Sequence, residues 1–137
     1  MIKALLDINV LLDVLQARRP HYESSAQVLS LCAEGLVKGY VSAGSFGVLD
    51  YLLVKGLGRE QGRLALKKVR SMTHVAMIDE RAVDLALESS FSDFEDAIQY
   101  YSAVGNGLSH IVTRNKKDFA RAKLVVATPE EFLEMRR

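Results

Sequence analysis

The sequence predicts an α/β fold: a three-layer α/β/α sandwich around a parallel sheet of about five strands. Short apolar runs alternate with longer segments whose apolar residues recur at helical spacing. The first run, residues 2–6, is nearly continuous, as in strands buried on both faces of a parallel sheet. No repeat or linker interrupts this alternation, and 137 residues is the usual length of one domain. We therefore expect a single domain over residues 1–137.

The first half of the chain is expected to form two strands, at residues 2–6 and 39–42. Helical periodicity predicts four helices beside them, at residues 10–15, 22–36, 46–54 and 59–72. The first of these helices stops before Pro20, and the third ends at a pair of glycines, which commonly terminate helices.

The same alternation continues in the second half of the chain. Three further strands are expected at residues 74–78, 109–113 and 123–126, with helices at residues 80–89 and 94–104. A last helix has clear start chemistry, with Thr128 as N-cap, Pro129 at the first position and Glu131 completing a capping box.

Composition excludes several classes of protein. The net charge of +1 argues against a strongly basic, non-specific nucleic-acid coat protein. The single cysteine, Cys32, excludes a disulfide framework and a cysteine-based zinc site, and we expect it to be a small buried hydrophobe. An acid interrupts the first apolar run too early for a signal peptide, and no apolar stretch reaches the length of a membrane span. We expect a cytoplasmic protein without membrane association.

Acidic residues recur where the carboxyl ends of the predicted strands should lie. Asp7 ends the first strand, Asp118 lies in the loop after the fourth, and Asp93 and Asp96 lie in the first turn of the helix that precedes the fourth strand. Two such charges ~4 Å apart repel by about 4 kcal/mol at an effective dielectric near 20. A hard divalent cation such as Mg²⁺ or Mn²⁺ would neutralise them, and a proton shared between acids is the alternative.

Three segments with these acids resemble the motifs of a known family. They are LLDINVLLD at residues 5–13, DFEDA at 93–97 and VTRNKKDF at 112–119. Together with the closing TPEEF at residues 128–132, they resemble the PIN domain, in particular its small bacterial branch related to VapC-type toxins. The resemblance implies a PIN-like fold and a ribonuclease that depends on Mg²⁺ or Mn²⁺ and hydrolyses RNA, often as a homodimer. In the toxin branch, an antitoxin protein would be a further partner.

The resemblance also implies roles for individual residues. Asp7 would be the first acid and main metal ligand, supported by Asn9. Asp96 would be the third acid and Asp118 the fourth, more peripheral one, so that Asp7, Asp96 and Asp118 form the catalytic set. Asp93 would be an additional acid beside Asp96, three residues away on one helix face.

This sequence departs from the family pattern at two positions. Ile8 replaces the usual Thr or Ser between Asp7 and Asn9, and Val48 falls where the family has its second acid, a Glu. The nearest acid is Asp50, two residues further on and thus about 200° around a helix. We keep Asp50 as a substitute supporting residue. The departure leaves open an alternative function, a non-catalytic PIN-like module that binds RNA or protein.

Several of these residues also have structural interpretations. Asp7 and Asn9 are favoured helix caps, and Ser92 with Glu95 forms the pattern of a capping box before residues 94–104. Asp13 and Glu23 are expected to be solvated, with a position leaning into the cleft as the alternative for either residue.

Polar residues after the fourth strand are candidates for substrate binding. Arg114, Asn115 and Lys116 lie beside the predicted site and would orient a phosphate backbone, with a solvated loop as the alternative. A phosphoacceptor receiver domain fits poorly, because a lone Asp7 follows the first strand and the Asp93/Asp96 pair lies on a helix.

Overall fold

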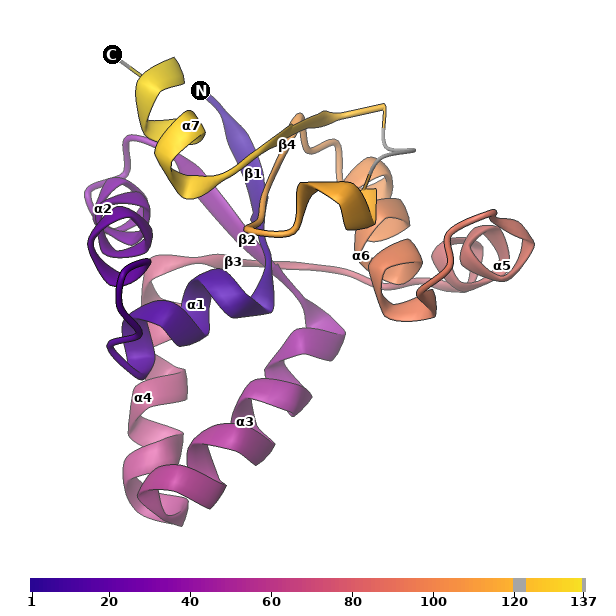
Figure 1. Cartoon of the computed structure of the whole chain (residues 1–137). Helices are drawn as coiled ribbons and strands as arrows, with labels where there is room; N and C mark the ends of the chain where they lie inside the picture. Colours follow the sequence, from indigo (N-terminus) through magenta and orange to yellow (C-terminus); the bar gives the residue numbers. More distant parts are fainter. Residues whose placement is uncertain (120–122, 137) are drawn as a thin grey trace.

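The computed structural model describes residues 1–119 and 123–136. Its five parallel strands form one sheet in the order β3-β2-β1-β4-β5 (Figure 1). The strands are β1 (Lys3–Leu6), β2 (Lys38–Ser42), β3 (His74–Ala76), β4 (His110–Val112) and β5 (Val125–Ala127). Each lies within two residues of its predicted range, because short apolar runs between helices are a local signal.

The helices follow the predicted order. They are α1 (Ile8–Leu15), α2 (Tyr22–Ala33), α3 (Ala43–Leu57), α4 (Arg59–Met72), α5 (Glu80–Glu88), α6 (Phe94–Gly105) and α7 (Pro129–Met135). The Thr128–Glu131 capping box at the start of α7 is present. The sequence did not predict the 3₁₀ turn η1 (Lys116–Phe119), and it placed the start of α3 three residues too late.

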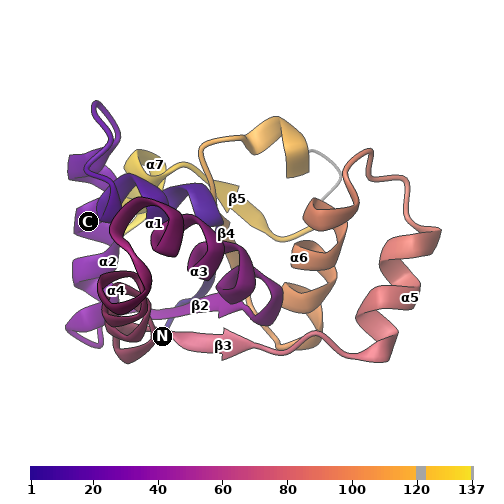
Figure 2. The ribbon, with the colours of Figure 1, turned by 90° about the horizontal axis from the view of Figure 1, so that it is seen from below.

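Helices cover both faces of the sheet, as the strand pattern predicts. Ala4 and Leu6 of β1 join a core cluster with residues of α1, α2, α3, α4 and α7. Leu5 faces the other way and packs with Tyr100 and Ala103 of α6. Figure 2 shows α5 and α6 at one side of the molecule and α1, α2 and α4 at the other. The three-layer α/β/α class is therefore confirmed.

Helices α3 and α4 pack against each other and extend together away from the sheet (Figure 1). Cys32 of α2 lies in the core, as expected for a small hydrophobe. Within the described residues, no helix is long and apolar enough to cross a membrane.

The central strands fix the position of the first acid. Leu6 of β1 pairs with Val112 of β4, and the amide of Asp7 donates to the carbonyl of Val112 at 3.0 Å. The residues that follow these two strands, Asp7 and Thr113, therefore lie side by side at the carboxyl edge of the sheet. Ligand sites of open parallel sheets form at this edge.

Candidate metal centre

A cavity of about 230 Å³ lies at the carboxyl edge of the sheet. Helices α1, α3 and α6 contribute to its wall, together with the segment that follows β4. Its lining residues are Asp7, Ile8, Asn9, Ser45, Val48, Asp93, Glu95, Asp96, Gln99, Asn115 and Asp118. The predicted acids Asp7, Asp93, Asp96 and Asp118 thus come from three distant parts of the chain to one cavity.

Asp7 is buried and held by donors on both carboxylate oxygens. Its Oδ1 accepts from the Ile8 amide at 2.8 Å, and its Oδ2 accepts from the Thr113 hydroxyl at 2.9 Å. Thr113 in turn accepts from the Asn115 amide at 3.1 Å, which ties the next loop to the same group. Asp7 is the N-cap of α1 and also lines the cavity, so its position agrees both with a helix cap and with a metal ligand.

The environment of Asp7 favours its neutral form. Burial raises the pKa of Asp7, and the negative charge of Asp118 adds to the rise. Hydrogen bonds from Thr113, Ile8 and Gln99 act in the opposite direction by stabilising the carboxylate. A cation placed beside Asp7 would therefore relieve an unfavourable burial of negative charge.

The start of α6 differs from the predicted capping box. Asp93, not Ser92, is the N-cap, and its Oδ1 accepts from the Asp96 amide at 3.1 Å. Asp93 has the extended backbone typical of an N-cap, with φ −107° and ψ 122°, and the helix begins at Phe94. The Ser92–Glu95 prediction was wrong because Asp93 supplies a competing cap one residue later.

Asp96 lies in the first turn of α6, where Glu95 is a second acidic residue. The pKa of Asp96 is raised to about 7, first by burial and then, in decreasing order, by the negative charges of Asp93, Asp118, Asp7 and Glu95. The carboxylates around the cavity therefore interact electrostatically, as the sequence predicted from their positions at one sheet edge.

The donor set fits a hard divalent cation by its chemistry. Carboxylate and amide oxygens line the cavity, and these are the ligands that Mg²⁺ and Mn²⁺ prefer. Gln99 Oε1 is buried and has no hydrogen-bond partner among the described residues, so α6 carries a polar oxygen that is unpaired. In residues 1–119 and 123–136, however, no three or more His, Cys, Asp or Glu side chains are already arranged to hold one ion.

The three candidate substrate-binding residues separate in the structure. Asn115 lines the cavity. Lys116 instead forms an ion pair with Glu131 of the α7 capping box at 3.0 Å. Arg114 is directed to Asp13 of α1, with its Nε 2.9 Å from Asp13 Oδ2.

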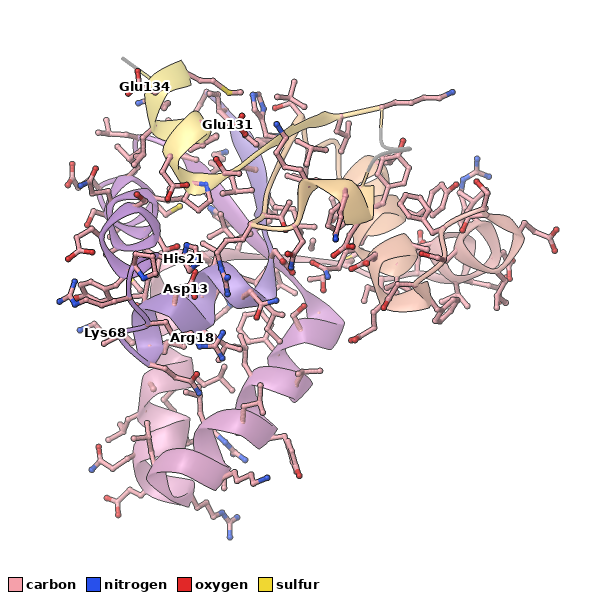
Figure 3. The ribbon with its side chains drawn as sticks, in the orientation of Figure 1. Asp13, Arg18, His21, Lys68, Glu131 and Glu134 are labelled. Carbon is pink, nitrogen blue, oxygen red and sulfur yellow. The ribbon has the colours of Figure 1, made fainter. Side chains whose placement is uncertain are left out.

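Asp13 is fully buried, which corrects the prediction that it is solvated. Its carboxylate lies 3.9 Å from Arg18 Nη1 and accepts from the Ser25 hydroxyl at 3.3 Å. Arg18 also donates to Asn9 Oδ1 at 3.4 Å, so this network reaches the cavity wall. Figure 3 shows Asp13 and Arg18 near each other beside α1.

Glu23, by contrast, is exposed as expected and pairs with Arg19.

Asp50 lies outside the cavity. It forms an ion pair with Arg63 of α4 at 2.8 Å, whereas Val48 and Ser45 of the same helix line the cavity. Two residues along a helix place the side chains about 200° apart, as expected, although α3 starts earlier than predicted. The position of the missing acid is therefore occupied by an apolar side chain, and Asp50 does not replace it.

The sequence analysis missed Gln99 and Ser45 in the cavity lining, and it assigned Glu95, which also lines the cavity, to helix capping. A signal for Gln99 was available, because a residue three positions after Asp96 lies on the same helix face. No comparable signal identified Ser45, since its position depends on where α3 begins.

Fold and site together define an α/β protein with an acidic cavity at the carboxyl edge of its parallel sheet. The sequence model of the PIN domain matches residues 3–117. The chain belongs to the PIN domain family, which confirms the family predicted from the three acidic motifs.

Individual relatives agree with this assignment. Ribonuclease VapC1 of Aquifex aeolicus (strain VF5) is 26% identical over 137 residues, covering 96% of this chain and 94% of that protein. A toxin–antitoxin complex from Klebsiella pneumoniae has a chain with a TM-score of 0.70 and 26% identity, covering 92% of this chain and 97% of that one. FitAcB from Neisseria gonorrhoeae matches in fold, with a TM-score of 0.71 at 20% identity, covering 93% of this chain and 98% of that one.

Proposed function

We propose that this protein is a ribonuclease that depends on Mg²⁺ or Mn²⁺ and hydrolyses phosphodiester bonds of RNA. The observation that carries the proposal is the single cavity lined by Asp7, Asp93, Asp96 and Asp118. The name of the Aquifex aeolicus relative, a ribonuclease, supports the same activity.

Each of the cavity residues would have its own role in such a site. Asp7 and Asp96, with Asp93 beside them, would hold the cation, which when bound polarises a phosphodiester and activates water. Hydrogen bonds from Ile8 and Thr113 keep the Asp7 carboxylate in one orientation. Asp96 or Asp7 would assist the attacking water by accepting its proton. Asp118, which also lines the cavity, would complete the catalytic set.

The surroundings of the cavity would position the RNA. Asn115 offers an amide at the cavity wall. Arg114 and Lys116 flank Asn115 in the sequence, and their ion pairs with Asp13 and Glu131 would hold this loop in place for RNA.

As partners, we propose an antitoxin protein that covers the cavity and a second copy of the chain in a homodimer. The solved toxin–antitoxin complex from Klebsiella pneumoniae supports the first of these partners.

Val48 favours a second candidate function. Its apolar side chain lines the cavity where the family has an acid, so this site has one carboxylate fewer than the family pattern. A PIN-like module of this kind would bind RNA or protein without turnover.

One set of assays separates the two candidates. The full chain is incubated with mixed single-stranded and structured RNAs in Mn²⁺, with and without chelator, beside Asp7→Asn and the matched control Asp50→Asn. A metal-dependent ribonuclease cleaves RNA in Mn²⁺, loses at least about a hundredfold of its rate in Asp7→Asn, and keeps it in Asp50→Asn, whose carboxylate lies outside the cavity.

The remaining outcomes contradict the first proposal. RNA binding without cleavage, with cleavage gained in Val48→Glu, would assign the non-catalytic function to the natural protein. Folded protein that neither cleaves nor binds RNA under any metal would rule out RNA as the substrate.

A further inference from the structure

Gln99 is the unexplained residue of the acidic cavity. It lies in α6, is only 8% exposed and lines the cavity. Its Oε1 is buried and has no hydrogen-bond partner in the described part of the chain. Native proteins rarely bury an amide oxygen without a partner, and such an atom usually marks a bound water, ion or ligand.

Packing alone does not account for a glutamine at this position. Its helix neighbours Tyr100 and Ala103 belong to an apolar core cluster, where a leucine of similar size would leave no polar atom unpaired. The same side chain acts on Asp7, because hydrogen bonding by Gln99 lowers the pKa of that carboxyl. Gln99 therefore lies beside the main acid of the cavity, with its oxygen buried and unpaired.

The contribution of α3 to the cavity gives this oxygen its importance. Val48 gives the cavity an apolar side chain from α3, so that helix contributes no carboxylate there. A neutral amide oxygen is a suitable partner for a hydrated hard cation, and it adds no charge to a cavity in which five acids already repel.

We propose that Gln99 is a positioning residue of this site. Its amide nitrogen orients Asp7, and its oxygen accepts a hydrogen bond from water that hydrates a bound divalent cation. The inference rests on the proposed metal dependence. Residues that orient the ligands of a metal commonly change its affinity by about 10–100-fold when they are replaced.

Mn²⁺ binding to the full chain, measured by calorimetry and by the Mn²⁺ electron paramagnetic resonance signal, tests the proposal. Gln99→Leu should weaken Mn²⁺ affinity at least about tenfold while the melting temperature without metal is unchanged or higher. Gln27→Leu, an exposed glutamine of α2, is the matched control and should bind Mn²⁺ like the wild type.

Three results would overturn the inference, and they are distinguishable from one another. Wild-type affinity in Gln99→Leu would show that Gln99 is not a positioning residue, while the proposed metal-dependent function would stand. Absence of Mn²⁺ binding in the wild-type protein would overturn both. A purely structural glutamine would give a third pattern, a lower melting temperature in Gln99→Leu with unchanged Mn²⁺ affinity, which also contradicts the proposal.

Discussion

Single residues at the sheet edge serve more than one purpose. Asp7 caps α1 through the Ile8 amide and also faces the cavity, and Asp93 caps α6 while lining the same cavity. Residues of this type satisfy the free amides at helix starts whether or not a ligand is present. The cap and the site are thus not alternatives, because a helix that begins at the sheet edge directs its cap toward the cavity.

Asp96 makes the metal-free protein less stable at alkaline pH. Its pKa rises from the ordinary 3.8 to about 7 on folding, so the folded state binds its proton more tightly than the unfolded state does. The resulting penalty is full above pH ~7 and fades as the pH falls toward 4. We predict that Asp96→Asn stabilises the chain in chelator at pH 8 by about 1 kcal/mol, a value reduced because Asp96 is only half-buried.

Urea unfolding with chelator at pH 8 and pH 5 measures this effect. The gain of Asp96→Asn should shrink at pH 5, and the exposed Asp84→Asn of α5 should show no comparable gain at either pH. An Asp96→Asn variant less stable than the wild type at pH 8 would show that the carboxylate makes net favourable contacts instead.

Among the helices, the α3–α4 pair depends on a close backbone approach. Gly62 of α4 is buried, and a Cβ at this position would lie 2.9 Å from the backbone of Leu53 and Val54 in α3. Backbone atoms cannot rotate away as side-chain ends do, so the helices would have to separate. The cost of such overpacking, typically 1–3 kcal/mol, exceeds the gain of about 1 kcal/mol from replacing a helical glycine.

We predict that Gly62→Ala lowers the free energy of unfolding by up to about 2 kcal/mol. Gly47→Ala is the matched control, because Gly47 lies in α3 with no atom within 4 Å of its would-be Cβ. That variant should be neutral or up to about 1 kcal/mol more stable. Thermal and urea unfolding of both variants provide the measurement, and equal stabilities would contradict the close-approach argument.

Across the whole molecule, Asp13 joins segments that are distant in sequence. It connects α1 to Ser25 of α2 and to Arg114 after β4, and it is fully buried. Removing one partner of such a group leaves charge uncompensated, which costs 3–5 kcal/mol for fully buried pairs. Arg114 and Arg18 are partly exposed, so we predict a loss of about 2–3 kcal/mol for Asp13→Ala.

The exposed acid Glu23 provides the comparison. Glu23→Ala breaks only its surface ion pair with Arg19 and should change the free energy of unfolding by less than about 1 kcal/mol. Urea unfolding of the two variants at pH 7 measures the difference. If both substitutions have the same small effect, the Asp13 network does not hold the loop after β4 in place.

The fold class was predictable because its signals are local. Apolar runs such as residues 2–6, helical stripes, and the Thr128–Glu131 capping box depend on neighbours within a few positions. Boundaries were less accurate where local preferences compete, as at Asp93 and Ser92, or where a helix start depends on packing, as at Ala43.

From the residue pattern alone, the order of strands and helices and the presence of acids at strand ends could be established, because periodicity and capping act over one or two turns. The gathering of Asp7, Asp96 and Asp118 around one cavity follows from strand pairing between segments more than a hundred residues apart. The same long-range packing buries Asp13 and leaves Gln99 Oε1 unpaired, since burial and partners are properties of the assembled layers.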